Sequence, residues 1–479
     1  TFRTHGGEIH AARYFCYNSA MPVNSFENYP LSWIPPWRRN EAPLPKGPLY
    51  LALAAALEAD IASGRLPPGT KLPPQRELAD YLDVNFTTLT RAYDLCRAKN
   101  LIYGVVGRGT FVAARGEEPV RPMSAETIDL GVVQAFPAVG GEEIVAAARE
   151  VLSRESARTL FSYGHREGAP RHRRAGQMWL AQRGINVPVG QVAVFPGVQS
   201  ALAATLLSVF SVGDTLATDP FTYANLIHLA RLAHVRLLPI PGDARGMDPE
   251  ALDEAARGGG LRGVFLMPEC ANPTTVTLDD ARRDEIAAVC ARHDLIVLED
   301  SATLDAAAAG RRSLFARLPE NTVHYAGSTR FLSPGLRVAF VAFPETLGGR
   351  VLAGLHHTSI KASALDAEIV SELILSGAAE RVLAAKAGRA RAANALFDRV
   401  FRRPSVPDDT RLFRMLPLPG TAGRGPEIEQ KYRAAGVAVC HSDRFAVSRG
   451  AKAAFLRLSL SSAVSSAQLE EAFTRMARV

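Results

Sequence analysis

The sequence predicts an α/β protein in which a small helical module precedes a large, mainly parallel sheet with helices on both faces. Three helix-like stretches lie between residues 48 and 99, and from residue 128 onwards short apolar runs alternate with stretches at helical spacing. The chain has 479 residues, of which 47% are hydrophobic, so it is long enough for two or three domains with large cores.

Composition limits the classes of protein to be considered. The longest apolar stretches, such as residues 51–57, end at charged residues well short of the roughly 20 residues that cross a membrane, so we expect no membrane partner. The five cysteines show no paired or metal-type spacing, which predicts reduced thiols, no metal site and a cytoplasmic protein. The net charge of +7 is compatible with nucleic acid as a partner, but charge alone does not identify one.

Residues 1–45 carry several aromatic side chains but have no sustained period of 2 or 3.6, so we expect an extended or partly disordered N-terminal arm. From Pro48 an apolar stripe predicts a first helix, which ends at the turn of residues 63–69. A second helix is expected over residues 75–82, and Asn85 is a suitable N-cap for a third helix over residues 86–99. Residues 101–112 carry three glycines between apolar residues, as a short hairpin does.

This succession resembles the winged helix-turn-helix of GntR regulators over residues 46–112. The resemblance rests on GRLPPGTKLPPQRELADYL at residues 64–82, on TTLTRAY at residues 87–93, and on GRGTFV at residues 107–112. It implies that a helix N-terminus enters the major groove of double-stranded DNA while the wing follows the backbone. A three-helix module with no nucleic-acid role is the alternative. The implied groove contacts are Thr87, Thr88, Thr90 and Arg91, and the implied phosphate or minor-groove contacts are Arg76 and Arg108.

Residues 113–127 lack periodicity and predict a short linker to a large domain over residues 128–479. A smaller α/β lobe is expected from about Leu352. The predicted strands of the large sheet are Val192–Phe195, Leu216–Thr218, Val235–Pro239, Gly263–Met267, Leu295–Glu299, Val323–Ala326 and Val338–Phe343.

Residues 324–337, HYAGSTRFLSPGLR, resemble the segment whose lysine binds pyridoxal phosphate in fold-type I aminotransferases and in regulators of the MocR/GntR type. The run from Ser333 to Arg337 fixes the register, and the lysine position falls on Arg330. A guanidinium stays protonated, with a pKa above ~12, so Arg330 cannot form a Schiff base. The chain also has no lysine between Lys99 and Lys361, the span that should build the cofactor domain.

The same resemblance implies further cofactor contacts. Tyr163, in YGHREGAP, matches a tyrosine that reaches the cofactor phosphate of the opposite subunit in a homodimer. Val198 and Gln199 follow a strand and open a helix whose free amides can cradle a phosphate. Tyr223 matches the aromatic residue that stacks on the pyridine ring, and Asn272 matches the donor to the phenolic oxygen.

The remaining implied contacts carry charge or hydroxyl groups. Asp300 matches the carboxylate that pairs with the ring nitrogen, which makes the ring an electron sink. Thr329 and Arg337 match phosphate ligands, whereas Ser328 lies one place out of the serine register. Arg457 matches the arginine that holds the α-carboxylate of a substrate or effector.

Together these patterns predict a DNA-binding transcription regulator whose aminotransferase-like domain senses a small amino compound without catalysis. Three states of the pocket stay open: pyridoxal phosphate bound non-covalently, the cofactor bound as an adduct with an amine, or a cofactor-free pocket that binds an anionic effector through Arg330, Arg337 and Arg457. The alternative function is an active aminotransferase that uses another amine, such as Lys361. A third possibility is a DNA-binding scaffold whose large domain only dimerises.

Overall fold

The computed structural model describes residues 33–39, 41, 43, 47–67, 70–99, 101–105, 109–112, 127–301, 312–448, 453–462 and 465–479. Most of the predicted arm and linker, and Arg108, lie outside these ranges. Two compact units, residues 1–123 and 124–479, are described separately below. None of the helices in the described ranges is both long and apolar enough to cross a membrane.

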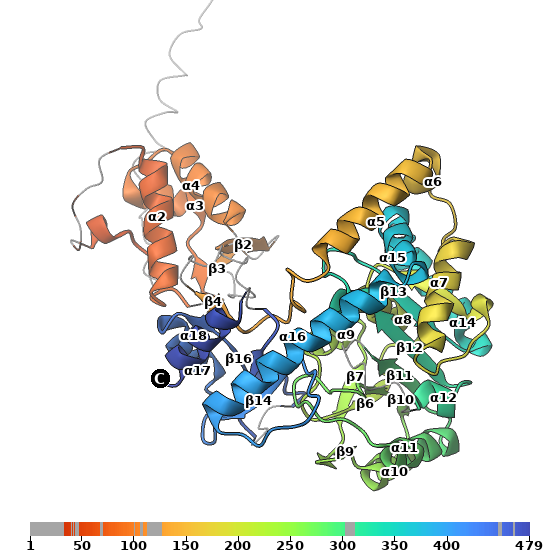
Figure 1. The fold of residues 1–479 in the computed structure, drawn as a ribbon. Coiled ribbons are helices and arrows are strands. Elements are labelled where there is room, and N and C mark those ends of the chain that lie inside the picture. Colours follow the sequence, from red (N-terminus) through yellow and green to blue (C-terminus); the bar gives the residue numbers. More distant parts are fainter. Residues whose placement is uncertain are drawn as a thin grey trace, which may run out of the picture. The chain divides into compact units, whose positions relative to one another are not determined.

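The first unit combines three helices with a three-stranded sheet, which confirms the predicted winged helix-turn-helix (Figure 1). The predicted N-cap is present, because the side chain of Asn85 accepts a hydrogen bond from the amide of Thr87 at 2.9 Å. The two-residue strand β1, which pairs with β3, was not predicted. The elements are η1 (Pro36–Arg38), α2 (Leu49–Ala62), β1 (Lys71–Leu72), α3 (Gln75–Leu82), α4 (Phe86–Ala98), β2 (Ile102–Val105) and β3 (Gly109–Val112).

The described part of the N-terminal arm is anchored to the first unit, which the lack of periodicity did not predict. Trp33 is 2% exposed, and its indole donates a hydrogen bond to Asp60 of α2 at 2.9 Å. Arg39 forms an ion pair with the same carboxylate at 2.9 Å. Arg38 donates to the main-chain oxygen of Leu82, at the end of α3, at 2.8 Å. One buried indole and two arginines therefore hold a segment that has no periodic pattern of its own.

We expect Trp33→Ala to lower the free energy of unfolding of the first unit by about 3–5 kcal/mol, because it removes a buried indole and one donor to Asp60. Hydrogen exchange of residues 49–99, measured in the full chain, should become faster. Leu51→Ala is the control, since it shortens a side chain on α2 that is already 45% exposed. Unchanged exchange in Trp33→Ala would show that the arm does not stabilise the unit.

The second unit contains a seven-stranded sheet in the order β5-β13-β12-β11-β10-β6-β7. Each predicted strand is present; β5 has the predicted ends, and the ends of the others differ by at most two residues. Only β13 within this sheet runs antiparallel to its neighbours, so the sheet is mainly parallel, as predicted. The strands are β5 (Val192–Phe195), β6 (Thr215–Thr218), β7 (Arg236–Pro239), β10 (Leu261–Leu266), β11 (Ile296–Asp300), β12 (Thr322–Gly327) and β13 (Ala339–Ala342).

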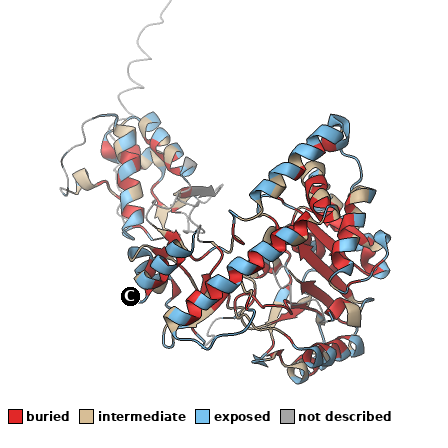
Figure 2. Cartoon of the chain, in the orientation of Figure 1, coloured by how far each residue is buried: buried red, intermediate tan, exposed pale blue. Residues whose placement is uncertain are grey.

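Helices cover both faces of this sheet (Figure 2), and every residue of β5, β11, β12 and β13 is buried, whereas the edge strand β7 is partly exposed. On β5, Val192 and Val194 belong to one core cluster, whereas Ala193 and Phe195 belong to another. Successive side chains of a strand point to opposite faces, so this alternation shows two apolar layers. The flanking elements are α5 (Gly141–Arg154), α6 (Ala157–Phe161), α7 (Pro170–Ala181), η2 (Val189–Gln191), α8 (Val198–Val209), α9 (Ala224–Leu232), β8 (Gly242–Asp243), β9 (Gly246–Met247), α10 (Pro249–Arg257), α11 (Asp280–Arg292), α12 (Leu314–Arg317), α13 (Ser328–Phe331), α14 (Glu345–Ser359) and α15 (Ala364–Leu375).

A smaller lobe follows the long helix α16 (Ala378–Phe401), and its three-stranded sheet has the order β14-β17-β16. This sheet begins at Phe413, later than the predicted boundary near Leu352, because α14 packs against α8 beside the large sheet. The elements of the lobe are β4 (Ile128–Asp129), β14 (Phe413–Pro417), α17 (Gly425–Ala434), β15 (Val437–Ala438), β16 (Cys440–His441), η4 (Ser442–Arg444), β17 (Phe455–Ser459) and α18 (Ser466–Met476).

Candidate functional site

The predicted cofactor residues follow the carboxyl ends of neighbouring strands. Strands β5, β12, β11, β10 and β6 run in the same direction, so these ends meet at one edge of the large sheet. Asp300 ends β11, Asn272 follows β10, Tyr223 follows β6 and Arg330 follows β12. Ligands of open α/β sheets bind outside this edge.

A cradle lies between the start of α8 and the segment before β13. Gly197 has φ +88°, and a Cβ there would lie 2.6 Å from Nη2 of Arg337, so glycine is required at this position. Arg337 donates to the hydroxyl of Thr329 at 3.4 Å. Within the described residues no side chain caps α8, so the amides of Val198 and Gln199 open the helix. A guanidinium, a hydroxyl and a helix N-terminus suit a phosphate.

Ser328 has a different position from the other predicted phosphate ligands. It is fully buried, and its hydroxyl lies 3.0 Å from the main-chain oxygen of Leu336 and 2.8 Å from that of Val338. A hydroxyl has one proton, so these two acceptors share it. Ser328 therefore closes the loop that carries Arg337.

Helix α13 is held from the side of the core. Phe331 is 3% exposed and stacks on Trp179, with ring centroids 4.0 Å apart. Residues three apart in a helical turn share a face, so Ser328 and Phe331 both point into the core. Thr329 and Arg330 lie on the other side of the turn and are half-buried.

Lys386 of α16 also contacts this segment. The residue is fully buried, and its ammonium donates to the main-chain oxygen of Leu332 directly after α13. Burial lowers the pKa of Lys386 to about 8. A lysine whose pKa is lowered on folding destabilises the folded state below that pKa, and stability returns as the pH rises toward the ordinary value of about 10.4.

We therefore expect Lys386→Met to raise the free energy of unfolding at pH 7, by up to about 3 kcal/mol. The difference between the variant and the natural chain should shrink between about pH 8 and 10.5. Urea unfolding of both proteins across this range measures the difference, and other titrating groups cancel in the comparison. A variant that is less stable at pH 7 would show that the hydrogen bond to Leu332 outweighs the burial of charge.

Tyr223 is linked through Asn225 to Gln199 at the start of α8, and it interacts electrostatically with Asp300. The side-chain amide of Asn225 donates to the hydroxyl of Tyr223 at 3.0 Å and to Oε1 of Gln199 at 2.8 Å. Burial raises the pKa of Tyr223, and the charge of Asp300 raises it further, so the phenol is neutral at pH 7. Asn225 was not predicted as a site residue, although it lies only two residues after Tyr223.

Arg330 lies in the same electrostatic environment. Burial lowers its pKa, the charge of Asp300 opposes that shift, and the charge of Arg457 adds to it. Asp300 is itself only 3% exposed. A guanidinium remains protonated at neutral pH even in such surroundings, so Arg330 is a permanent cation.

Arg457 reaches from β17 of the smaller lobe to the edge of the large sheet. It is 7% exposed, and its Nη1 donates to the side-chain oxygen of Asn272 at 3.3 Å. Its Nη2 donates to the main-chain oxygen of Gly131. Its Nε is buried and has no acceptor among the described residues. An unpaired buried N–H destabilises the protein, so a ligand oxygen placed there would be favoured.

Tyr163 is not brought into the pocket of its own chain. It lies between α6 and α7, and it is 76% exposed. An exposed ring at this position is accessible to a second protomer, as the role implied for it requires.

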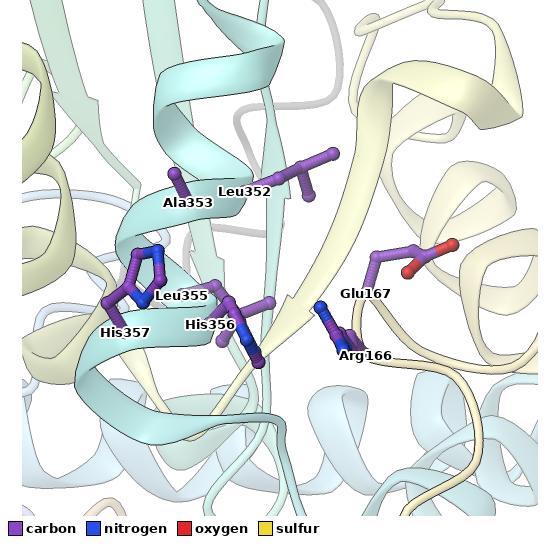
Figure 3. A pocket seen from close by; sticks show the side chains of 7 residues that line it. All are labelled: Arg166, Glu167, Leu352, Ala353, Leu355, His356 and His357. Atoms are coloured by element: carbon purple, nitrogen blue, oxygen red, sulfur yellow. The ribbon is translucent and has the colours of Figure 1, made fainter.

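A separate cavity of about 310 Å³ lies between the loop before α7 and helix α14 (Figure 3). Figure 3 shows the side chains of Arg166 and His356 facing each other across it. The cavity contains none of the residues predicted to hold a cofactor. Its lining residues are Arg166, Glu167, Leu352, Ala353, Leu355, His356 and His357.

The predicted DNA contacts of the first unit lie on α3 and on the first half of α4. Arg76 is exposed, and its guanidinium lies 5.7 Å from the centroid of the Phe86 ring. Arg91 is exposed as well and lies 4.2 Å from the ring of Tyr50. Thr87 is exposed in the first turn of α4. These cationic and polar groups are accessible to DNA.

Thr88 and Thr90 are half-buried. The hydroxyl of Thr90 donates to the main-chain oxygen of Phe86 at 3.0 Å and lies 3.1 Å from Oε1 of Gln75, so it joins α3 to α4. Lys71 of β1 was not predicted as a DNA contact. It lies beside the wing, because a Cβ at Gly109 would be 2.9 Å from its side chain. A lysine directly before the Leu-Pro motif is the signal that could have found it.

The pocket fits pyridoxal phosphate except at one position. The guanidinium of Arg337 packs against Gly197 at the start of α8, so it and the helix amides could contact one phosphate, and the unpaired Nε of Arg457 suits a carboxylate. Pyridoxal phosphate, when bound, supplies an electron-withdrawing ring and an aldehyde that reacts with amines. Position 330 offers no amine to that aldehyde.

Two known families match the chain. "Aminotransferase class I and II" matches residues 133–476, and "Bacterial regulatory proteins, gntR family" matches residues 49–112. The chain is 33% identical over 467 residues to the uncharacterized HTH-type transcriptional regulator YdeF of Bacillus subtilis, covering 96% of this chain and 99% of that protein. It is 26% identical over 359 residues to the probable rhizopine catabolism regulatory protein MocR of Rhizobium meliloti, covering 68% and 72% of the two chains.

Solved structures show the same fold in the second unit. The α-aminoadipate aminotransferase LysN of Thermus thermophilus, complexed with N-(5'-phosphopyridoxyl)-L-leucine, has a TM-score of 0.65 and 25% sequence identity. The similarity covers 75% of this chain and 93% of that enzyme.

Proposed function

The chain belongs to the MocR-type transcription regulators, in which a GntR-family DNA-binding domain precedes an aminotransferase class I and II domain, and we propose that it couples DNA binding to occupancy of the pocket at Arg330. The proposed organisation is an arm (1–45), a DNA-binding domain (46–112), a linker (113–127) and a sensor domain (128–479). The proposed assembly is a homodimer on a double-stranded operator, with Tyr163 contributed across the interface.

The proposal is supported by a set of candidate binding groups that is present without a nucleophile beside it. Arg337 donates to Thr329 and packs against Gly197 at the uncapped start of α8, and Arg457 keeps an unpaired N–H. Arg330 stands where covalent chemistry would need a deprotonated amine. Binding groups that are present without the reacting amine favour sensing over turnover.

The proposed ligand is pyridoxal phosphate, bound non-covalently or as an adduct with a small amino compound. A cofactor-free pocket that holds an anionic effector is the remaining alternative. Within the proposal, Val198, Gln199, Thr329 and Arg337 would hold the phosphate, Tyr223, Asn272 and Asp300 would contact the ring, and Arg457 would hold an effector carboxylate.

An active aminotransferase would need another amine at the cofactor. The side chain of Lys361 donates to the main-chain oxygen of Ser162 at 2.8 Å, and that of Lys386 donates to Leu332. Both amines would have to leave these acceptors to reach a ligand, so the geometry does not favour this alternative.

The test uses operator fragments selected in vitro with the full chain. Their affinity is measured by fluorescence anisotropy without ligand, with pyridoxal phosphate, and with pyridoxal phosphate plus an amino-acid mixture. We expect a change of about fivefold or more with ligand. Arg337→Gln should bind DNA normally and lose this response. An affinity that no ligand changes would contradict the coupling, and sustained amino-group transfer to 2-oxoglutarate would support the enzyme.

A further inference from the structure

We infer that Arg330 makes the pocket select its ligand by charge, favouring phosphorylated pyridines that carry an aldehyde or a carboxylate at ring position 4 over those that carry an amine. The inference rests on the proposed function and deepens it, because it names the chemical class of ligand for the same site. In this inference Arg330 is a ligand-binding residue that carries a permanent positive charge.

The first step is that Arg330 has a fixed position. Its helix turn is anchored by the buried hydroxyl of Ser328, by the stacking of Phe331 on Trp179 and by the hydrogen bond from Lys386 to Leu332. These contacts lie on both sides of Arg330 in the sequence. The guanidinium therefore extends from a rigid base at the carboxyl edge of β12.

The side chains predicted to contact the ligand carry a net positive charge. Among the residues predicted to contact the ligand, Arg330, Arg337 and Arg457 carry three positive charges and Asp300 carries one negative charge, which leaves a net charge of +2 for these four groups; Asp129, whose charge acts on Arg457, is not a predicted contact. A pyridine with a dianionic phosphate, a protonated ring nitrogen and an ionised phenol carries −2 before its substituent is counted. An aldehyde leaves the total at zero, a carboxylate adds an anion, and a protonated amine adds a cation.

Water screens the charge of the substituent at ring position 4 poorly, because the groups around it are buried or half-buried. Asp300 and Arg457 are less than one-tenth exposed, and the half-buried Arg330 interacts electrostatically with both. A cation added to such a site is repelled by guanidinium groups that cannot lose their protons. A carboxylate can instead form charge-assisted hydrogen bonds with Arg330. A lysine at this position could be neutralised by reaction with an aldehyde, whereas an arginine cannot.

The test compares three probes that share the ring and the phosphate: pyridoxal 5'-phosphate, 4-pyridoxic acid 5'-phosphate and pyridoxamine 5'-phosphate. Isothermal titration calorimetry gives the Kd of each for the natural chain, for Arg330→Gln and for Arg389→Gln. The last variant is the matched control, because it removes the same charge from an exposed position of α16. 4-Pyridoxic acid 5'-phosphate cannot form a Schiff base with a lysine. The ratio of its Kd to that of pyridoxamine 5'-phosphate therefore reports the effect of charge without covalent bonding.

We expect the natural chain and the control to bind the carboxylate and aldehyde probes at least about tenfold more tightly than the amine probe. Arg330→Gln should bring the three Kd values within about threefold of one another. Equal binding of all three probes by the natural chain, or an unchanged ratio in a folded Arg330→Gln, overturns the inference and leaves the cofactor proposal intact. If the natural chain binds none of the probes, the cofactor proposal and the inference both fail.

Discussion

Arg330→Lys is expected to make the chain bind pyridoxal phosphate covalently, with about one cofactor per chain fixed by borohydride and none fixed to the natural protein. The groups that would position the cofactor are already present, because the cradle at Gly197, Thr329 and Arg337 does not involve the side chain at position 330. A lysine there would lie among other cations in a partly buried site, which lowers the pKa of an amine and so makes it nucleophilic.

The control for this experiment is Arg389→Lys, which adds a lysine on the exposed side of α16 and reports reaction with surface amines. Peptide mapping should locate the label at residue 330 alone. Label at Lys361 or Lys386 of the natural protein would restore the enzyme alternative. A folded Arg330→Lys that takes up no cofactor would show that the pocket has diverged beyond residue 330.

The large sheet could be predicted strand by strand, because strands buried on both faces are continuous apolar runs. On β5 all four residues are buried, and they alternate between two core clusters. The direction of β13 could not be predicted in the same way, since an apolar run has the same composition in either direction. The pairing of β4 with β15 joins two-residue strands that are far apart in the sequence, and such short strands have no measurable period.

Some residues of the candidate site could be identified from the sequence, and others could not. Arg330 could be identified because Ser333 to Arg337 fix the register of its segment. Lys386 and Gly131 could not be identified, since they contact the pocket segments only through tertiary packing and belong to no motif.

Arg91→Ala is expected to weaken operator binding by about tenfold or more, whereas Arg97→Ala on the same helix should change it by about twofold or less. Arg91 lies one turn after Thr87, so the two side chains share a face of α4 near its N-terminus. The ring of Tyr50 at 4.2 Å restricts the guanidinium of Arg91, which reduces the entropy lost on binding. Arg97 instead forms an ion pair with Asp94 at 2.8 Å in the last turn.

Salt and sequence dependence separate two ways in which Arg91 could act. If it reads a base, Arg91→Ala should lose discrimination at one operator position, while the slope of log K against log salt changes little. If it contacts a phosphate, binding should weaken equally on all sequences and the slope should fall by about one. Equal losses in Arg91→Ala and Arg97→Ala would contradict the placement of the N-terminal half of α4 in the groove. The position of Arg91 beside Thr87 at the start of the helix favours base reading, since the N-terminal residues of a recognition helix reach base edges.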